Sequence, residues 1–355
     1  MNTNPATSSW SGPLATAAAS VALAAAELGT SQWASVVRAW CVPYLFQGME
    51  EVFKNDADPA LGLQLMLDRL TTTLRTSAAS GFGALSTPAG KREQGTPVEQ
   101  VTGEHYGRLF REFSKESFAS EPARLLNERL TRNDVTLPDL KTARVLDAGC
   151  GGGRYSVAWH LLGAKDVLGV DLSEPGIADA RARADAMKLH GVRFEHADVV
   201  ELPLERDSFD VVFSNGVLHH TRDWARGIQG LVSVLKPGGL GWLYLIENPG
   251  GYFWDVIDLA RQVMTNEVHE QARVAVAMLG IPANRVFYML DHVMVPINLR
   301  LTSEEITGEL RKAGARDIRR LTRGTDFDRV ERIYQRDPYA TEKYGVGEHR
   351  FIFTK

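Results

Sequence analysis

Between Ala143 and Glu247, short β-rich runs alternate with helical runs, and this alternation constrains the fold more than any other feature of the chain. Strict alternation of strand and helix requires right-handed crossovers, which build a parallel sheet covered by helices on both faces. The predicted strands are ARVLDAG, DVLGVDL, VRFEHAD, FDVVFSNGV and LGWLYLIE, and RDIRRLTRG and HRFIFTK predict two more near the end of the chain. The sequence therefore predicts an α/β fold.

Helical patterns dominate the segments on either side of this region. The stretch 80–102 is rich in Gly, Pro, Ser and Thr without a regular period, which predicts a linker. We expect residues 1–100 to form a helical cap or dimerisation region that ends in this linker. Residues 101–355 are then expected to form the ligand-binding domain. Its insertion, 248–301, is aromatic-rich and mostly helical, and it suits a lid or a dimer contact.

The charge of the chain bears on its partners. Its 355 residues carry a net charge of -4, which argues against a surface dominated by phosphate contacts, so we do not expect a nucleic-acid partner. The arginine-rich stretch RKAGARDIRRLTRGTDFDRVERIYQRD contains interspersed Asp and Glu. Such interspersion favours a solvated face or local ion pairs over an RNA surface.

Cysteine content and hydropathy bear on the compartment. Cys41 and Cys150 are too few for a disulfide framework, and no Cys/His spacing matches a zinc site, so we expect a cytoplasmic protein without a metal. The apolar run PLATAAASVALAAAELG follows a segment without Lys or Arg, which predicts a helix rather than an export signal. No run approaches the roughly 20 apolar residues of a membrane span, and we therefore expect no membrane association.

The segment VLDAGCGGGRYS places a glycine-rich turn between the first predicted strand and a helix. Gly149, Gly151 and Gly153 allow the backbone to turn sharply and to approach a ligand, because glycine has no Cβ. Their G-x-G-x-G spacing differs from the G-x-G-x-x-G of dinucleotide sites. Asp147, just before them, would repel a pyrophosphate but suits a cationic ligand. Taken alone, the turn is also compatible with an α/β protein that binds no ligand.

Two further acids follow the next predicted strands. Asp171 ends the second strand, the position at which an acid accepts the hydroxyls of a ribose in nucleotide-binding folds. Asp198 ends the third strand at the same edge. A carboxylate there can accept a hydrogen bond from an exocyclic amine such as that of adenine. These acids favour a nucleoside ligand at this edge of the sheet.

At these residues the sequence resembles the class I S-adenosylmethionine-dependent methyltransferases. VLDAGCGGG looks like motif I, GVDLS like the acidic segment after it, HADVVELPLERDSFDVVFSNGVLHH like motif II with its flanks, and LKPGGLGWLYL like motif III. The outer parts of the chain match no family pattern. The resemblance implies a seven-stranded Rossmann-like methyltransferase sheet with the last strand antiparallel, and S-adenosyl-L-methionine as the cofactor.

The resemblance also implies a role for each residue that matches the motifs. The glycine turn would wrap the methionine part of the cofactor, Asp171 would hold the ribose, and Asp198 and Val199 would flank the adenine. Asn215 would line the pocket below the sulfonium, and Tyr106 would contact the cofactor from a helix that precedes motif I. The expected cofactor-binding residues are Tyr106, Asp147, Gly149, Gly151, Gly153, Asp171, Leu172, Asp198, Val199 and Asn215.

The sequence says less about which residues contact the molecule that accepts the methyl group. A sulfonium already carries an activated methyl group, so alignment and exclusion of water can suffice and a general base is optional. His219, after the fourth strand, is expected to border the methyl group as a base or an orienting group. Its neighbour His220 is expected to contact the substrate or to pack against the following helix. Tyr252, Phe253 and Trp254, which begin the insertion, are expected to wall the acceptor site.

The sequence favours methyl transfer to a small molecule of specialised or central metabolism, by in-line displacement at an N, O, S or C nucleophile. Three alternatives stay open. S-adenosylmethionine could itself be cyclised with release of methylthioadenosine, the protein could bind it without turnover, or the acceptor could be RNA.

Overall fold

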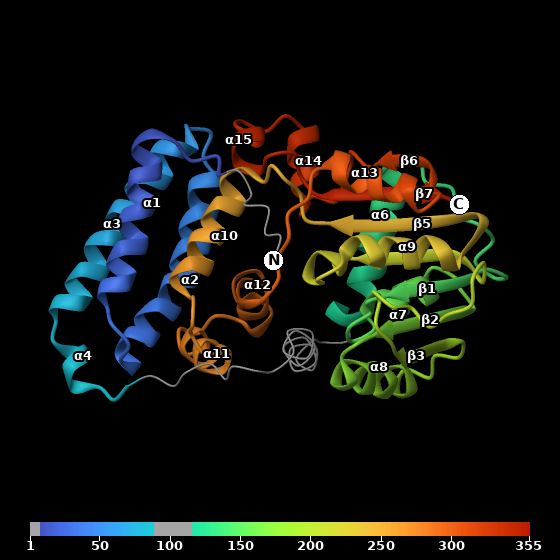
Figure 1. Cartoon of the computed structure of the whole chain (residues 1–355), viewed down its shortest axis with the longest axis horizontal. Coiled ribbons are helices and arrows are strands. Elements are labelled where there is room, and N and C mark those ends of the chain that lie inside the picture. Colours follow the sequence, from blue (N-terminus) through green and yellow to red (C-terminus); the bar gives the residue numbers. More distant parts are fainter. Residues whose placement is uncertain (1–7, 89–115) are drawn as a thin grey trace.

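The computed structural model describes residues 8–88 and 116–355, and the protein has two parts (Figure 1). A layer of helices, drawn in blue and orange, lies beside an α/β part drawn mainly in green, yellow and red. The helical layer combines helices from the beginning of the chain with helices from the segment that follows the fifth strand. Tyr106 and most of the predicted linker fall outside the described residues.

Seven strands form one sheet in the order β3-β2-β1-β4-β5-β7-β6. Its first five strands pair in parallel, and β7 pairs antiparallel to both β5 and β6. The predicted α/β fold, with seven strands and an antiparallel last strand, is therefore confirmed. The strands are β1 Arg144–Ala148, β2 Asp166–Asp171, β3 Val192–His196, β4 Phe209–Asn215, β5 Leu235–Leu245, β6 Arg316–Arg320 and β7 His349–Thr354.

Helices cover both faces of the sheet. One face buries apolar side chains of α9 and α13, and the other buries those of α6, α7 and α8. Strands of such a sheet lie between two apolar layers, which explains their nearly continuous burial. The flanking elements are the π-helix η2 Glu116–Ser120, α6 Glu121–Arg132, α7 Arg154–Leu161, α8 Glu174–Ala186, the 3-10 turn η3 Leu218–His220, α9 Trp224–Val234, α13 Ser303–Lys312, α14 Arg329–Tyr334 and α15 Ala340–Tyr344.

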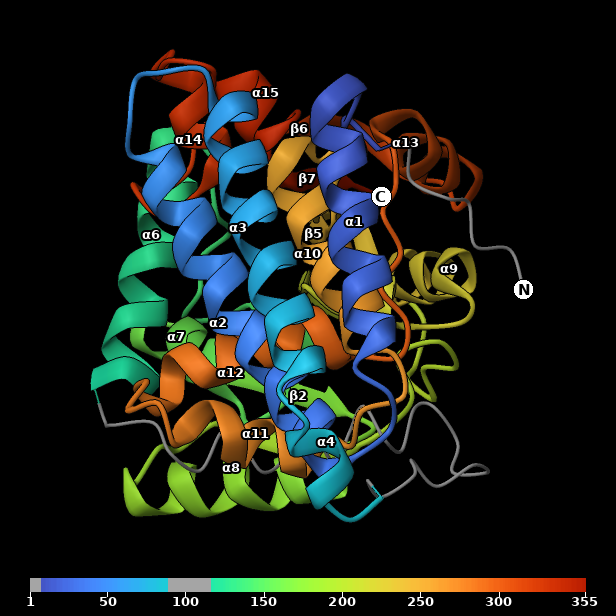
Figure 2. The same cartoon turned by 90° about the vertical axis from the view of Figure 1, so that its left-hand side faces the viewer.

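The helical layer has one continuous apolar core. Side chains from the N-terminal helices and from the insertion after β5 are buried together, so the two segments pack as one unit. Figure 2 shows α1, α2 and α3 side by side, and Figure 1 shows α10, α11 and α12 between these helices and the sheet. The helices are α1 Gly12–Glu27, α2 Gln32–Phe53, α3 Pro59–Ala79, α4 Phe82–Leu85, α10 Gly251–Val263, α11 His269–Ala277 and α12 Ala283–Met294.

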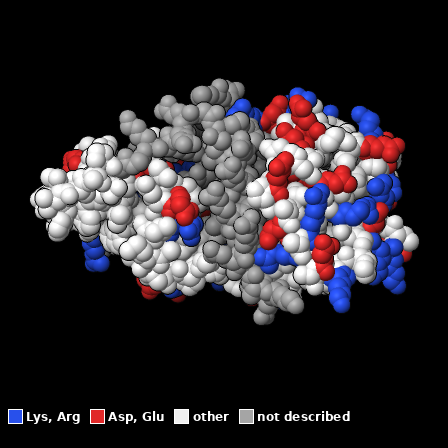
Figure 3. All heavy atoms as spheres, turned by 90° about the horizontal axis from the view of Figure 1, so that it is seen from below, with Lys and Arg blue, Asp and Glu red and all other residues white. Residues whose placement is uncertain are grey.

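The surface charge also differs between the two parts. Figure 3 shows acidic and basic side chains interspersed over the visible face of the α/β part, and few charged side chains on that of the helical layer. The arginine-rich stretch near the C-terminus contains local ion pairs, as its interspersed acids predicted: Arg323 pairs with Glu331 at 2.8 Å and Arg332 with Asp337 at 3.5 Å. No helix among the described residues is long and apolar enough to cross a membrane.

Candidate active site

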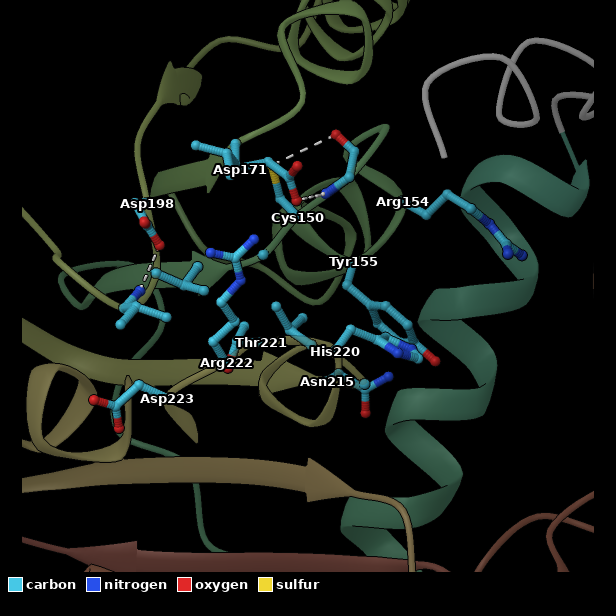
Figure 4. Close-up of a pocket in the computed structure, with 17 residues that line it drawn as sticks. Cys150, Arg154, Tyr155, Asp171, Asp198, Asn215, His220, Thr221, Arg222 and Asp223 are labelled. Atoms are coloured by element: carbon cyan, nitrogen blue, oxygen red, sulfur yellow. Dashed lines mark hydrogen bonds between the residues drawn. The ribbon is translucent and has the colours of Figure 1, made fainter. Parts of the chain in front are cut away.

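A pocket of about 300 Å³ opens at the carboxyl ends of β1, β2 and β4. Ligands bind at this edge in open α/β sheets, because the loops after the parallel strands meet there. Figure 4 shows Asp171 and Asp198 on one side of the pocket and Asn215, His220 and Tyr155 on the other. The predicted site residues that line the pocket are Gly149, Gly151, Asp171, Leu172, Asp198, Val199, Asn215 and His220.

The glycine turn forms one wall of the pocket because its backbone adopts conformations that side chains disfavour. Gly149 has φ of +84°, and a Cβ added there would lie 2.3 Å from Cγ2 of Val217. Gly151 also has a positive φ, and its amide donates a 2.8 Å hydrogen bond to Oδ2 of Asp171. The turn thereby ties the end of β1 to the end of β2.

Asp171 presents a partly buried carboxylate at the end of β2. Its Oδ2 accepts from the amide of Gly151 and its Oδ1 accepts from the amide of Ser173, each at 2.8 Å. Burial raises the pKa of this carboxyl group, while the two amides oppose the rise. Because each carboxylate oxygen can accept two hydrogen bonds, both oxygens keep the capacity to accept from a diol.

Asp147 lies behind the glycine turn and is not among the pocket-lining residues. Its Oδ2 accepts a 2.6 Å hydrogen bond from the Ser156 hydroxyl, and burial raises its pKa to about 7. This arrangement connects β1 to α7. Gly153 is the N-cap of α7 and also lies outside the lining, and a Cβ added there would lie 2.7 Å from Cζ of Phe194. Asp147 and Gly153 therefore stabilise the glycine turn without lining the pocket.

Two more polar residues have defined partners at the pocket wall. Oδ1 of Asp198 accepts from the amide of Val200 at 2.8 Å, which holds the carboxylate at the start of its loop. The amide oxygen of Asn215 accepts from the indole nitrogen of Trp242 at 3.2 Å. That bond turns the Asn215 amide nitrogen, a donor, away from the indole.

The adjacent histidines occupy different positions. His220 lines the pocket, and its Nδ1 donates to the carbonyl of Ile297 at 2.7 Å, whereas His219 is 2% exposed and lies outside the lining. Their rings are 4.1 Å apart at 70°. Burial lowers the pKa of His220 to about 4 and lowers that of His219 well below its ordinary value. Both imidazoles are therefore neutral at neutral pH.

None of the three aromatic residues predicted to wall the acceptor site lines this pocket. Tyr252, Phe253 and Trp254 are on α10, and the latter two are buried in the core of the helical layer. The indole nitrogen of Trp254 donates to Oε1 of Glu247 at 2.8 Å. These side chains thus lie at the junction between the end of β5 and the helical layer.

Several lining residues were not predicted from the sequence. Arg154 and Tyr155 directly follow the glycine turn, and their position in the first turn of α7 is a signal that could have identified them. The others come from the turn itself or from the loops after β3 and β4. They are Cys150, Val200, Gly216, Val217, Thr221, Arg222 and Asp223.

A glycine turn after β1 that is bonded to an acid at the end of β2 is an arrangement typical of nucleoside-binding α/β domains. The crowding at Gly149 and the acid behind the turn make this site differ from a pyrophosphate cradle. Residues 146–243 match the model of the methyltransferase domain family. This part of the chain is a class I S-adenosylmethionine-dependent methyltransferase domain, and S-adenosylmethionine is its cofactor.

Individual relatives match over part of their length. The chain is 35% identical over 161 residues to 27-O-demethylrifamycin SV methyltransferase of Amycolatopsis mediterranei, covering 43% of this chain and 57% of the relative. It is 39% identical over 108 residues to tRNA U34 carboxymethyltransferase of Idiomarina loihiensis, covering 29% and 32%. The structure of a methyltransferase from Mesorhizobium loti aligns with a TM-score of 0.42 at 22% identity, covering 65% of this chain and all of that one.

The pocket residues fit the cofactor. Asp171 supplies acceptors for a diol, Leu172 and Val199 supply apolar surface for a base, and the carboxylate of Asp198 can accept from its amine. Gly149 and Gly151 both adopt a positive φ, and at Gly149 the Val217 side chain takes the place that a Cβ would need. The described residues thus bring hydrogen-bond acceptors, apolar surface and a narrow backbone turn together in one pocket.

Proposed function

We propose that this protein transfers a methyl group from S-adenosylmethionine to a small-molecule acceptor. The observation that carries the proposal is the pocket beside the glycine turn, in which Asp171, Asp198 and Asn215 lie along one sheet edge within a methyltransferase domain. A relative that matches over 57% of its length is named for O-methylation of a small molecule, which supports an acceptor of this kind.

The residues of this chain would bind and orient the reactants. Asp171 would accept from the ribose, Asp198 and Val199 would hold the adenine, and Asn215 and His220 would face the reacting end of the pocket. When bound, S-adenosylmethionine supplies an activated methyl group. His219 would orient the acceptor or take its proton; its imidazole is neutral, and the lowered pKa makes it a weak proton acceptor, which favours the orienting role.

The test is product analysis by mass spectrometry after incubation with S-adenosylmethionine and a set of hydroxylated aromatic compounds. Formation of S-adenosylhomocysteine that requires an acceptor supports the proposal. Release of methylthioadenosine without an acceptor would overturn it in favour of cyclisation. Cofactor binding without turnover of any acceptor would identify a binding protein, and steeply salt-dependent RNA binding would point to an RNA substrate.

A further inference from the structure

A cluster of polar and aromatic side chains lies between the cofactor pocket and the helical layer. Its members come from η3, from the carboxyl end of β5 and the residues after it, and from α12 and α14. We call it the junction cluster, and its members are His219, Tyr244, Glu247, Tyr288, His292 and Arg329.

Ring contacts order each side of the junction cluster, and Trp254 joins the two sides, since it lies beside His292 and its indole nitrogen donates to Oε1 of Glu247 at 2.8 Å. The ring of Tyr244 lies 5.9 Å from that of His219, and the ring of Tyr288 lies 4.5 Å from that of His292. His292 also lies 5.5 Å from the Trp254 indole. Burial is the main cause of the lowered pKa of His219, and the nearby His292 contributes to it. The strand side and the helix side of the cluster therefore face each other.

An ion pair between Arg329 and Glu247 lies at one end of the junction cluster. The guanidinium of Arg329 donates to Oε1 of Glu247 at 2.8 Å, and its Nη1 lies 3.6 Å from Oε1 of Glu348. The same guanidinium stacks over the ring of Phe253, 4.4 Å from its centroid. Glu348 also lies 3.6 Å from Nη1 of Arg350, so Glu247 balances the charge of Arg329 and the cluster offers no unbalanced cation to an anionic ligand.

Several polar groups of the cluster have no hydrogen-bond partner among residues 8–88 and 116–355. Oε2 of Glu247, whose side chain is fully buried, and Nδ1 of His219 are both unpaired. The hydroxyls of Tyr244 and Tyr288 are likewise unpaired within the described parts of the chain, although both side chains keep some accessible surface. An unpaired buried polar group costs about 1 to 3 kcal/mol, so the two buried atoms, Oε2 of Glu247 and Nδ1 of His219, indicate a ligand that completes these bonds.

The hydrogen bond of the His292 ring determines which kind of group a ligand must present to that ring. Its Nδ1 lies 2.7 Å from the carbonyl of Tyr288, and a carbonyl only accepts, so this nitrogen carries the proton. The neutral ring therefore presents a lone pair at Nε2. Together with Oε2 of Glu247, this gives two acceptors that require donors, whereas the tyrosine hydroxyls can donate or accept. Hydroxyl groups on the ligand satisfy all four positions.

The cluster also adjoins the cofactor pocket. His219 contacts His220, a lining residue, and Gly216 lines the pocket while facing Tyr244: a Cβ added there would lie 3.5 Å from Cδ1 of that ring. A molecule held by the cluster would therefore have one end next to Gly216 and His220.

We propose that the junction cluster binds the acceptor, and that this acceptor is an uncharged aromatic compound carrying hydroxyl groups. The inference rests on the proposed function, which it extends to a substrate class. The aromatic rings of Tyr244 and Tyr288, which keep some accessible surface, suit a planar apolar body, and the unpaired acceptors and hydroxyls suit its hydroxyl groups. The balanced ion pair of Glu247 and Arg329 disfavours a ligand with a net charge.

The test is a fluorescence titration with 2-naphthol as the probe, in the presence of saturating S-adenosylhomocysteine. We expect saturable binding of 2-naphthol and much weaker binding of naphthalene-2-sulfonate and of 2-naphthylmethylammonium. Tyr288→Phe should weaken 2-naphthol binding about three- to tenfold, the usual effect of one lost hydrogen bond. Its melting temperature should match the wild type, because the Tyr288 hydroxyl has no partner among the described residues. Tyr339→Phe, on the surface, is the matched control.

Two results would overturn the proposal: equal affinity of wild type and Tyr288→Phe for 2-naphthol, or binding of either charged probe as tight as that of 2-naphthol. Because the readout is binding, it is independent of turnover. If 2-naphthol binds as expected but no acceptor yields S-adenosylhomocysteine, the proposed methyl transfer fails while the binding site stands.

Discussion

Replacement of Asp171 by alanine tests the cofactor site most directly. The carboxylate accepts two backbone amides, and its remaining acceptor capacity is the feature assigned to the ribose. In Asp171→Ala the ribose hydroxyls lose their acceptor, and the amides of Gly151 and Ser173 lose theirs. Hydrogen bonds to a charged group contribute about 1.5 to 3 kcal/mol. Rearrangement of the glycine turn in the variant widens the expected range of the lost binding energy. We expect a loss of about 1 to 3 kcal/mol in binding, which is about a 5- to 150-fold higher Kd.

Isothermal titration with S-adenosylhomocysteine measures this Kd without the need for an acceptor. Asp171→Asn keeps the side-chain volume and one acceptor oxygen, so its Kd should lie between those of the wild type and Asp171→Ala. Asp68→Ala, on the exposed face of α3, is the control and should bind like the wild type. A melting curve for each variant separates loss of affinity from loss of fold. A Kd of Asp171→Ala within twofold of the wild type would refute the ribose role.

Three further predictions follow from the site. Gly149→Ala places a Cβ 2.3 Å from Val217 at a positive φ, so it should lower the melting temperature and weaken S-adenosylhomocysteine binding. Gly238→Ala, which is also at a positive φ but has open space around the added Cβ, is the control for the clash. Equal effects of the two substitutions would contradict the crowding argument. Burial raises the pKa of Asp147 to about 7, so the folded state binds more protons than the unfolded chain between about pH 4 and 7, and the free energy of unfolding should decrease as the pH rises through this range. Asp147→Asn should remove that dependence in urea titrations, and an unchanged slope would exclude Asp147 as its source. His219→Ala should reduce kcat more than it changes the Kd for S-adenosylhomocysteine, whereas intact turnover from pH 6 to 9 would remove His219 as a base.

The positions of Asp171, Asp198 and Asn215 along one pocket could be predicted from the sequence because their placement is local. Each residue ends or directly follows a parallel strand, and the carboxyl ends of these strands meet at one sheet edge. The same reasoning does not show which residues of the glycine-turn motif face the pocket. Asp147 and Gly153 belong to the same motif, yet their side-chain positions face β3 and α7 rather than the pocket.

The histidines show why the acceptor side was harder to predict. Adjacent residues of a short helical turn point in different directions, but the sequence does not show which one faces the pocket. The segment that returns from the insertion decides this, because the carbonyl of Ile297 accepts from His220 and the amide of Leu299 donates to the carbonyl of His219. Both contacts join residues almost eighty positions apart in the chain.

The sequence by itself determined the α/β fold and the cofactor edge, since these depend on alternation, turn chemistry and strand ends, and its motifs implied seven strands with the last one antiparallel. Only the tertiary structure showed that α1–α3 and α10–α12 share one core and that Glu247 and Arg329 meet beside Tyr244. The physical reason is that an apolar stripe on a helix shows that one face is buried but does not identify its partner. Packing between distant segments makes that choice, and in this protein it also assembles the proposed acceptor site.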